Sequence, residues 1–259
     1  MQQAISRTSG NQSGHRSTFQ VPISDPLERL LKTHSQTIGA GHFLLMDGDE
    51  TEFVFCLLSG WLSLSKCLPD GDVQILDLAL PGEIIEAGSG HGFGSAVNIE
   101  ALTEVCVAIV PASKWKEMKR QRPDLNTVIR TVQASARARI AERMLRLGRG
   151  NGAMRVAYAL LELNTRLEDV GQSKDGRFQI PMNQRVLGDF VGLTAVHVCR
   201  TLSHLASRGI VRASGHMSIE ILDIDGLAEI AGVDLHSLQG DLCAEPSHTQ
   251  ALLCNPAYS

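Results

Sequence analysis

The sequence predicts an α+β protein in which an N-terminal β-roll is followed by a long helix and a C-terminal winged helix-turn-helix. Three observations predict this class. Short apolar runs divided by turn residues fill the first half of the 259-residue chain, apolar residues at near-3.5-residue spacing follow, and two glycines punctuate a helical segment near residue 190. Because 43% of the residues are hydrophobic, the chain can bury substantial cores, and its length suits two domains.

The formal net charge of −4 conceals a segregated distribution of charge. Residues 25–112 carry 3 basic against 13 acidic side chains, whereas residues 113–150 carry 11 basic against 3 acidic ones. Residues 180–216 are again basic, with 4 basic side chains against 1 acidic one. Such segregation indicates a polyanionic partner for the basic part of the chain. The alternative is that the basic residues of 113–150 form the solvated face of a helix.

The N-terminal part of the chain predicts a polar tail, a short helix and a β-roll. Residues 1–24 are expected to be disordered, and Asp25 with Pro26 is typical of the N-cap and first turn of a helix over 25–35. The runs FVFCLL, LSLSKCL, VQILDLAL and EVCVAIV follow, divided by DGDE, SG, PDGD and PG. They predict strands of a roll, barrel or sandwich, with a hairpin at PDGD, so residues 25–111 are assigned to one β-roll domain.

Residues 112–149 predict a long helix that joins two copies of the chain. Its apolar side chains form a narrow seam with arginines between them: Leu125, Ile129, Val132, Ala136, Ile140 and Leu147. A seam this long and thin is typical of a coiled-coil-like helix, so these residues are predicted to form a homodimer interface. The glycine-rich sequence GRGNG at 148–152 predicts a hinge before a domain over 150–232.

The stretch QRVLGDFVGLTAVHVCRTLSHL at 184–205 fits a helix-turn-helix. Gly188 supplies the small residue where the second helix crosses the first, and Gly192 supplies the positive φ that the turn requires. Thr194 is a suitable N-cap for the second helix. The apolar residues that pin the pair to a core are Leu187, Val191, Leu193, Val198 and Leu202. IVRASGHMSIEIL then predicts the hairpin of a wing, and the alternative for the whole segment is an ordinary helical hairpin.

These features, in this order, resemble the Crp/Fnr superfamily of bacterial transcription regulators over roughly residues 25–232. The resemblance is carried by DGDETEFVFCLLSGWLSLSKCLPDGDVQILDLALPGEII and, more specifically, by IPMNQRVLGDFVGLTAVHVCRTLSHLASRGIV. The second block is similar to the Fnr and FixK branch. The resemblance implies a cyclic-nucleotide-binding-like β-roll, a dimerisation helix and a winged DNA-binding domain. It also implies a cytoplasmic activator of transcription that binds a pseudo-palindromic site in double-stranded DNA and contacts RNA polymerase.

The resemblance also assigns the residues expected to read the bases of DNA. Arg200 matches the family arginine that contacts guanine, and an arginine can bond guanine O6 and N7 together. Where the family has an acidic residue and a serine, this sequence has Val196 and Cys199. Val196 suits a thymine methyl group, and His197 becomes a candidate base contact, so the half-site is expected to differ from the family's usual one. The candidate phosphate contacts are Thr194, Ala195, Arg185, Arg212 and His216.

Six cysteines are scattered without a CxxC pair, so free thiols and no metal site are expected. Cys199 precedes Arg200 and has His197 nearby, positive surroundings that favour oxidation of the thiol. Oxidation there is hypothesised to weaken DNA binding. The alternative is a small residue tolerated where the family has serine. Cys56, Cys67 and Cys106 are expected to be buried strand residues.

No cofactor is expected in the roll. Residues 82–101 contain no Arg or Lys to pair with the phosphodiester of a cyclic nucleotide, and Gly82–Glu83 is interpreted as a turn between strands. Residues 1–55 contain no cysteine that could bind an iron–sulfur cluster. The effector is therefore unknown. The alternative is a sensor for a cyclic nucleotide or for haem, with His42, His91 and Cys56 as candidate haem ligands.

Other classes of function find less support. No GxSxG, Walker A, HExxH or GxGxxG motif lies in a suitable context, so no catalytic residue and no enzyme are expected. With only 4% aromatic residues, double-stranded DNA fits better than single strands or RNA. No apolar run approaches the roughly 20 residues of a membrane helix, and no secretory signal is apparent. Residues 233–259 lie outside the resemblance, and no role is assigned to this tail.

Overall fold

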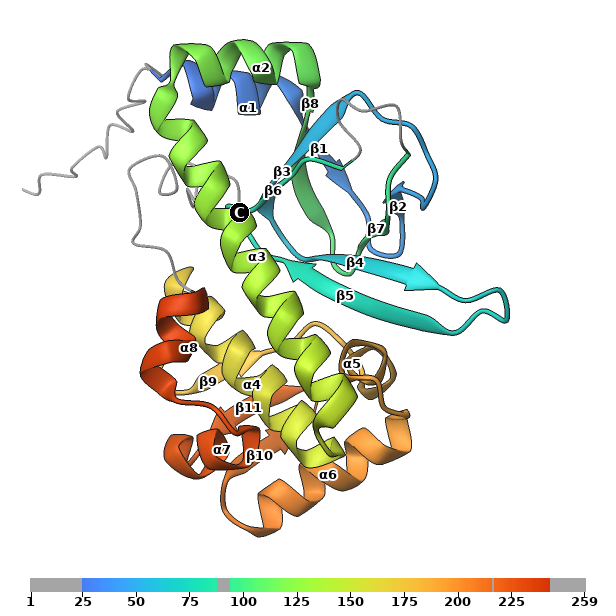
Figure 1. Cartoon of the computed structure of the whole chain (residues 1–259), viewed down its shortest axis with the longest axis vertical. Helices are drawn as coiled ribbons and strands as arrows, with labels where there is room; N and C mark the ends of the chain where they lie inside the picture. The colour runs from blue at the N-terminus through green and yellow to red at the C-terminus, as the bar shows by residue number, and fades with distance from the viewer. Residues whose placement is uncertain (1–24, 88–93, 216, 243–259) are drawn as a thin grey trace, which may run out of the picture.

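The structure is a computed structural model that describes residues 25–87, 94–215 and 217–242. Figure 1 shows a β-roll at the top, a winged part at the bottom, and one long helix that crosses from the first to the second. The predicted disordered segment 1–24 and the tail beyond residue 242 lie outside the described residues. The parts follow one another in the chain order that the apolar pattern indicates.

The roll consists of helix α1 (Pro26–His34) and two four-stranded antiparallel sheets. The strands are β1 (Ser35–Ile38), β2 (Phe43–Leu45), β3 (Phe53–Ser59), β4 (Leu62–Cys67), β5 (Val73–Ala79), β6 (Ile84–Ile85), β7 (Asn98–Ala101) and β8 (Val105–Pro111). Their orders are β1-β8-β3-β6 and β2-β7-β4-β5. PDGD forms the β4–β5 hairpin, closed by a hydrogen bond of 2.8 Å from the Leu68 amide to the Asp72 carbonyl. The predicted helix cap is confirmed, since Asp25 accepts from the amide of Leu27.

The helical segment after the roll is divided by a proline. Helix α2 (Ala112–Gln121) ends before Arg122, and α3 (Pro123–Arg149) begins at the proline. Proline has no N–H and disfavours helical backbone in the residue before it, so one continuous helix cannot form there. Trp115 and Met118 of α2 pack with α1 and the β1-β8-β3-β6 sheet. The N-terminal turns of α3 belong to the same core.

The winged part consists of five helices and a small three-stranded sheet in the described residues. Its elements are α4 (Gly152–Asp169), β9 (Arg177–Gln179), α5 (Gln184–Val191), α6 (Ala195–Ser207), β10 (Val211–Ser214), β11 (Ser218–Ile221), α7 (Ile224–Ala231) and α8 (Leu235–Leu242). The sheet order is β10-β11-β9. Helix α8 lies inside the range assigned to the tail, and its Leu238 and Leu242 are buried in the core of the winged part.

The roll and the winged part share a core through β5, an edge strand of its sheet. Ile75 and Leu78 of β5 join the hydrophobic cluster that fills the winged part. In a regular strand, residues three apart face opposite ways. Here a β-bulge shifts the register, pairing Ser65 with Ile75 but Leu64 with Asp77. The extra residue lets Ile75 and Leu78 face the same cluster, as bulges characteristically re-aim side chains.

Candidate DNA-binding site

The helix-turn-helix forms where the sequence predicts it, from α5 and α6. Gly192 ends α5 in the left-handed region, with φ of 66°. A β-carbon on Gly188 would stand closer than 3.0 Å to the carbonyl oxygen of Leu193, so only glycine permits this crossing. Thr194 caps α6 by accepting from the amide of His197 at 3.3 Å. The roles of these residues in the turn are confirmed.

Two side chains from outside hold the turn in place. The guanidinium of Arg155, on α4, donates to the carbonyls of Leu147 at 2.8 Å and of Gly192 at 3.1 Å. It therefore ties the C-terminus of α3 to the turn. From the roll, Gln74 Nε2 donates to the carbonyl of Asp189 at 2.7 Å, near the C-terminus of α5. Sequence reasoning missed both residues because their partners are distant backbone carbonyls.

One face of α6 is presented to solvent. Val198, Leu202 and Leu205 are buried against the core. The exposed side chains lie on the opposite face and are Val196, His197, Cys199, Arg200, Ser203, His204, Ala206 and Ser207. Figure 1 shows α6 along the lower margin of the molecule, away from the roll. The four predicted base contacts therefore lie on one exposed helical face, together with Ser203 and His204, which the sequence analysis did not single out.

The polar groups of this face differ in how far they are already engaged. His197 Nδ1 lies 3.0 Å from the hydroxyl of Thr194, which leaves Nε2 for another partner. In the part of the chain that the structure describes, no hydrogen bond or ion pair of Arg200 is found. An exposed guanidinium of this kind keeps all five donors for an incoming partner. Ala195, in the first turn of α6, is half-buried.

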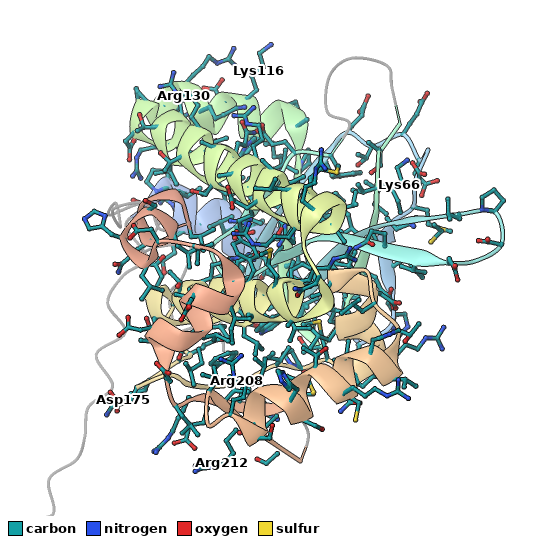
Figure 2. The ribbon with its side chains drawn as sticks, turned by 60° about the horizontal axis from the view of Figure 1, so that its bottom comes forward. Lys66, Lys116, Arg130, Asp175, Arg208 and Arg212 are labelled. Atoms are coloured by element: carbon teal, nitrogen blue, oxygen red, sulfur yellow. The ribbon has the colours of Figure 1, made fainter. Side chains whose placement is uncertain are left out.

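The wing carries a cation that is already paired. Arg212 on β10 forms an ion pair with Glu220 on β11, and Arg177 on β9 binds the same carboxylate at 2.7 Å. Hydrogen bonds from Arg177 first, and the charges of both arginines, lower the pKa of Glu220. Figure 2 shows Arg212 and Arg208 at the outer surface of this part. The predicted phosphate contact Arg212 is thus exposed but partly neutralised, and His216 lies outside the described residues.

A groove runs between the start of α5 and the wing. It has a volume of about 650 Å³ and is lined by residues 179–185 with Gly215 and Met217. Asn183 caps α5 by accepting from the amides of Arg185 and Val186, each at 3.0 Å. Arg185, which the sequence analysis proposes as a phosphate contact, is exposed at this helix start. The asparagine before an amphipathic run was an available signal for the cap, and the sequence analysis did not use it.

The structure changes the interpretation of the seam on α3. Leu125, Ile129 and Val132 are 0%, 5% and 8% exposed within a single chain, and the first two belong to the core of the roll. Side chains already buried have almost no surface left for a partner, so the prediction of a dimer contact is wrong for these three. Ala136 and Leu147 are half-buried, and Ile140 is 39% exposed. Met144 and Leu145, one helical turn further, are 66% and 56% exposed.

The thiols are more varied than expected. Cys56 is buried as predicted, and burial raises its pKa well above the usual range. Cys67 is exposed at the end of β4 and Cys106 is only half-buried, so the expectation of burial is wrong for the first and incomplete for the second. Cys199 is exposed and lines a second groove of about 240 Å³ between α6 and the wing. Of the candidate haem ligands, His42 is exposed and His91 lies outside the described residues.

The fold and this face define a class of protein, a winged-helix DNA-binding protein carrying a β-roll. The family model of the Crp-like helix-turn-helix domain matches residues 154–230, and that of the cyclic nucleotide-binding domain matches residues 35–122. The nitrogen fixation regulation protein FixK of Bradyrhizobium diazoefficiens is 31% identical over 185 residues, 71% of this chain and 76% of that protein. The transcriptional activator protein Anr of Pseudomonas aeruginosa is 26% identical over 83% of this chain and 87% of its own length. The structure of FixK2 from Bradyrhizobium japonicum superposes with a TM-score of 0.68 at 26% identity, over 77% of this chain and 98% of that one.

The chain belongs to the Crp/Fnr family of transcription regulators. Its function is DNA-binding regulation of transcription, and the family is one of regulators rather than enzymes. Among the helices of the described residues, none is long and apolar enough to cross a membrane.

Proposed function

We propose that this protein is a homodimeric activator in which α6 of each copy enters the major groove of one half of a pseudo-palindromic site. The observation that carries the proposal is the exposed face of α6, on which Arg200 has no partner within the described chain. Arg200 reads a guanine by bonding O6 and N7, a contact worth about 1–3 kcal/mol of discrimination. Val196 packs on a thymine methyl, and Cys199 and His197 contact neighbouring base edges.

The backbone of DNA is held by groups around this helix. Thr194 and Ala195 present the N-terminus of α6 to a phosphate, and Arg185 does the same at the start of α5 beside the 650 Å³ groove. On the wing, Arg212 contacts the next phosphate, and we assign a further phosphate contact to His216, which lies outside the described residues. Because Arg212 shares Glu220 with Arg177, its contribution to affinity is expected to be smaller than that of Arg185.

The two copies associate through the exposed side of α3. An apolar patch of three exposed side chains, Ile140, Met144 and Leu145, lies within two turns of α3. Ile140 and Met144, at i and i+4, share one face of the helix. A pair of α3 helices joined there places two recognition heads on DNA about one helical turn, or about 34 Å, apart. The buried end of α3 fixes the helix to its own roll.

Activation follows from the relatives, two of which are named as transcriptional activators in Pseudomonas aeruginosa and Stutzerimonas stutzeri. We assign RNA polymerase as the second macromolecular partner of the DNA-bound dimer and the cytoplasm as the place where it acts. Cys199 supplies a redox control: oxidation to a sulfenic acid by peroxide adds a bulky polar group on the face that meets the bases.

A binding experiment with purified full-length protein tests the proposal. Genomic fragments bound by the wild type are recovered, footprinted, and used in mobility-shift titrations with the Arg200→Ala variant. The expected result is a loss of about 10- to 100-fold in affinity for the footprinted site, with relaxed preference at one base pair per half-site. Arg208→Ala, which removes an exposed cation at the C-terminal end of the same helix, serves as the matched control. Equal binding by wild type and Arg200→Ala would refute the role given to α6.

A further inference from the structure

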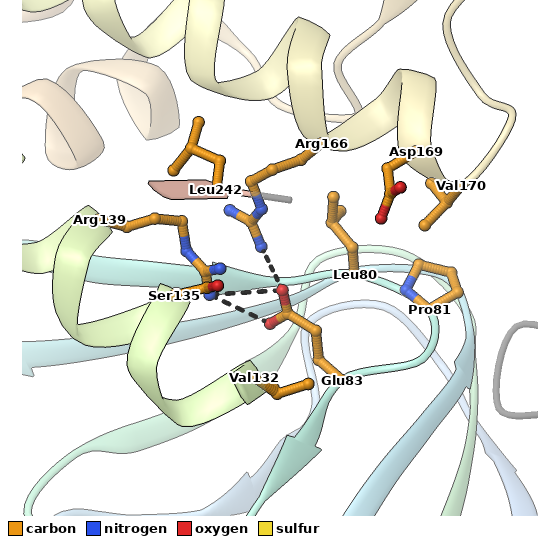
Figure 3. A pocket seen from close by; sticks show the side chains of 10 residues that line it. All are labelled: Leu80, Pro81, Glu83, Val132, Ser135, Arg139, Arg166, Asp169, Val170 and Leu242. Carbon is orange, nitrogen blue, oxygen red and sulfur yellow. Dashed lines mark hydrogen bonds and ion pairs between the residues drawn. The ribbon is translucent and has the colours of Figure 1, made fainter. Parts of the chain in front are cut away.

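Six charged side chains form a closed ring where the roll, α3 and α4 meet. The ring alternates in sign and runs through Asp77, Arg139, Glu83, Arg166, Glu162 and Arg143 back to Asp77. The roll contributes two carboxylates, α3 contributes two guanidiniums, and α4 contributes one of each. Figure 3 shows one side of the ring, where Glu83 is held between Arg139 and Arg166 beside a small cavity of about 40 Å³.

The geometry of the ring is that of direct hydrogen-bonded ion pairs. Arg139 Nη2 and Arg143 Nη2 bind the two oxygens of Asp77 at 2.8 Å and 2.7 Å. The other nitrogen of Arg143 binds Glu162 at 2.7 Å, and Arg166 binds Glu162 at 3.2 Å. Arg166 also binds Glu83 at 2.8 Å, and Arg139 closes the ring on Glu83 at 3.3 Å.

The ring is buried, and each of its charges therefore needs its oppositely charged partners. Arg139, Arg166 and Glu162 have side chains that are 2%, 4% and 0% exposed, and only Glu83, at 20%, approaches solvent. Removing one partner of a buried pair leaves an uncompensated charge in a medium that stabilises it poorly. If the roll strands moved away from α3 and α4, Asp77 and Glu83 would leave behind three guanidiniums and one carboxylate, a net charge of +2. The ring therefore favours one orientation of the two parts.

The ring also reaches the helix-turn-helix directly. The guanidinium carbon of Arg143 lies 4.6 Å from the ring centroid of Phe190, a buried residue of α5. This distance is typical of a cation–π contact. Gln74, three residues before Asp77 on the same strand, donates to the Asp189 carbonyl at the end of α5. Strand β5 of the roll is thus linked to α5 directly through Gln74 and indirectly through Asp77 and Arg143 of α3.

We propose that Asp77 and Glu83 of the roll are positioning residues for DNA recognition, which fix the angle at which α6 is presented relative to the dimer helix α3. The proposal rests on the proposed function. With the ring intact, the two winged parts of a dimer (its heads) are held at one separation. When the first head has bound its half-site, the second head is therefore present at a raised effective concentration near the second half-site. With the ring broken, each head still recognises a half-site, but the separation between the heads is no longer fixed.

The test measures how affinity depends on half-site spacing. The wild-type protein selects its site from random duplexes, and anisotropy titrations then compare three duplexes: the selected site, the same site lengthened by two base pairs at its centre, and a single half-site. For the wild type we expect the selected site to bind about 100-fold more tightly than the lengthened one. For the double variant Asp77→Asn/Glu83→Gln we expect this ratio to fall at least about tenfold, with half-site affinity unchanged.

Three controls keep the result decisive. Arg200→Ala is expected to weaken binding to the single half-site as well as to both full-length sites, because it removes a base contact from each head, whereas the ring variants are expected to leave half-site affinity unchanged. Glu83→Gln alone changes the most exposed member of the ring and preserves a folded protein should the double variant unfold. It is expected to lower the spacing ratio in the same direction. Glu117→Gln, on the exposed surface of α2, is expected to leave the ratio unchanged.

Each outcome bears on a different statement. If folded Glu83→Gln and the folded double variant both prefer the selected site over the lengthened one as strongly as the wild type does, the positioning role of the ring is overturned. Failure of the wild type to select any sequence would overturn the proposed function itself, and with it the inference that depends on it.

Discussion

The carbonyl oxygen of Leu193 occupies the space in which a β-carbon of Gly188 would stand, so the crossing of α5 and α6 leaves no room for any other residue. Gly188→Ala is therefore expected to destabilise the protein by about 1–3 kcal/mol, although alanine is ordinarily the better helix former. Specific DNA binding falls with it, because α6 must shift. Chemical denaturation and operator titration measure the two effects.

The control for this substitution is Gly240→Ala in α8, where nothing lies within 4 Å of the added methyl group. It is expected to leave stability unchanged or to raise it by about 0.5–1 kcal/mol. If Gly188→Ala keeps the stability and the DNA affinity of the wild type, then α5 and α6 can move apart at this crossing without consequence, which would contradict the prediction.

The second prediction concerns the two ends of α3. Met144→Glu and Leu145→Glu place a charge in the exposed apolar patch and are expected to yield folded monomers with weakened binding to the full site. Leu125→Ala removes a fully buried side chain from the core of the roll and is expected to cost about 2–5 kcal/mol of stability. Sedimentation equilibrium with thermal unfolding separates the two effects. Dimers that persist in both glutamate variants would place the interface elsewhere.

The third prediction is a pH dependence. Burial alone would raise the pKa of Asp77, but Arg139, Arg143 and Arg166 outweigh it and hold that pKa far below its usual range. A carboxylate whose pKa is lower in the folded state contributes stability above its unfolded pKa of about 3.9, and this contribution is lost as the pH falls from there toward the folded value.

Asp77→Asn is accordingly expected to lower the free energy of unfolding by about 3–5 kcal/mol at pH 7. The difference in the free energy of unfolding between the wild type and this variant is expected to narrow as the pH falls below about 4. Urea titrations at a series of pH values measure this. The control Asp47→Asn removes the exposed partner of Lys66 and is expected to cost about 0–1 kcal/mol. A gap that stays constant down to the acid transition would contradict the assignment.

The fourth prediction concerns oxidation of the recognition helix. Mild peroxide is expected to reduce the operator affinity of the wild type reversibly, because Cys199 is exposed beside Arg200. Cys199→Ser is expected to bind DNA and to resist peroxide, whereas Cys67→Ser, which removes another exposed thiol, keeps the wild-type sensitivity. Mass spectrometry of the treated protein assigns the modified residue. Equal affinity before and after oxidation of Cys199 would remove the redox role.

The helix-turn-helix was predictable because its requirements are local. Gly188, Gly192 and Thr194 each answer a backbone need within a span of seven residues, and sequence spacing alone expresses it. The strands of the roll were predictable for a similar reason, since turn residues such as PDGD separate short apolar runs.

Contacts between distant segments were not predictable in this way. The apolar period of α3 is the same whether a side chain faces a second copy or its own roll, so Leu125 and Ile129 were assigned to the wrong partner. The ion-pair ring joins residues as far apart as Glu83 and Arg166. The sequence did contain a hint, because Asp77 and Glu162 are single acids inside otherwise apolar runs, where a charge requires a buried counterpart.

The exposed rim of a β-sheet is a template on which another strand can pair, and β5 forms such a rim in the roll. In this molecule α5 and the junction with α3 and α4 lie against that strand, and Ile75 and Leu78 are buried with it. Detaching the winged part would uncover an unpaired strand together with its apolar side chains. The DNA-binding half therefore also protects the roll from self-association, and variants that loosen the junction should aggregate before they unfold completely.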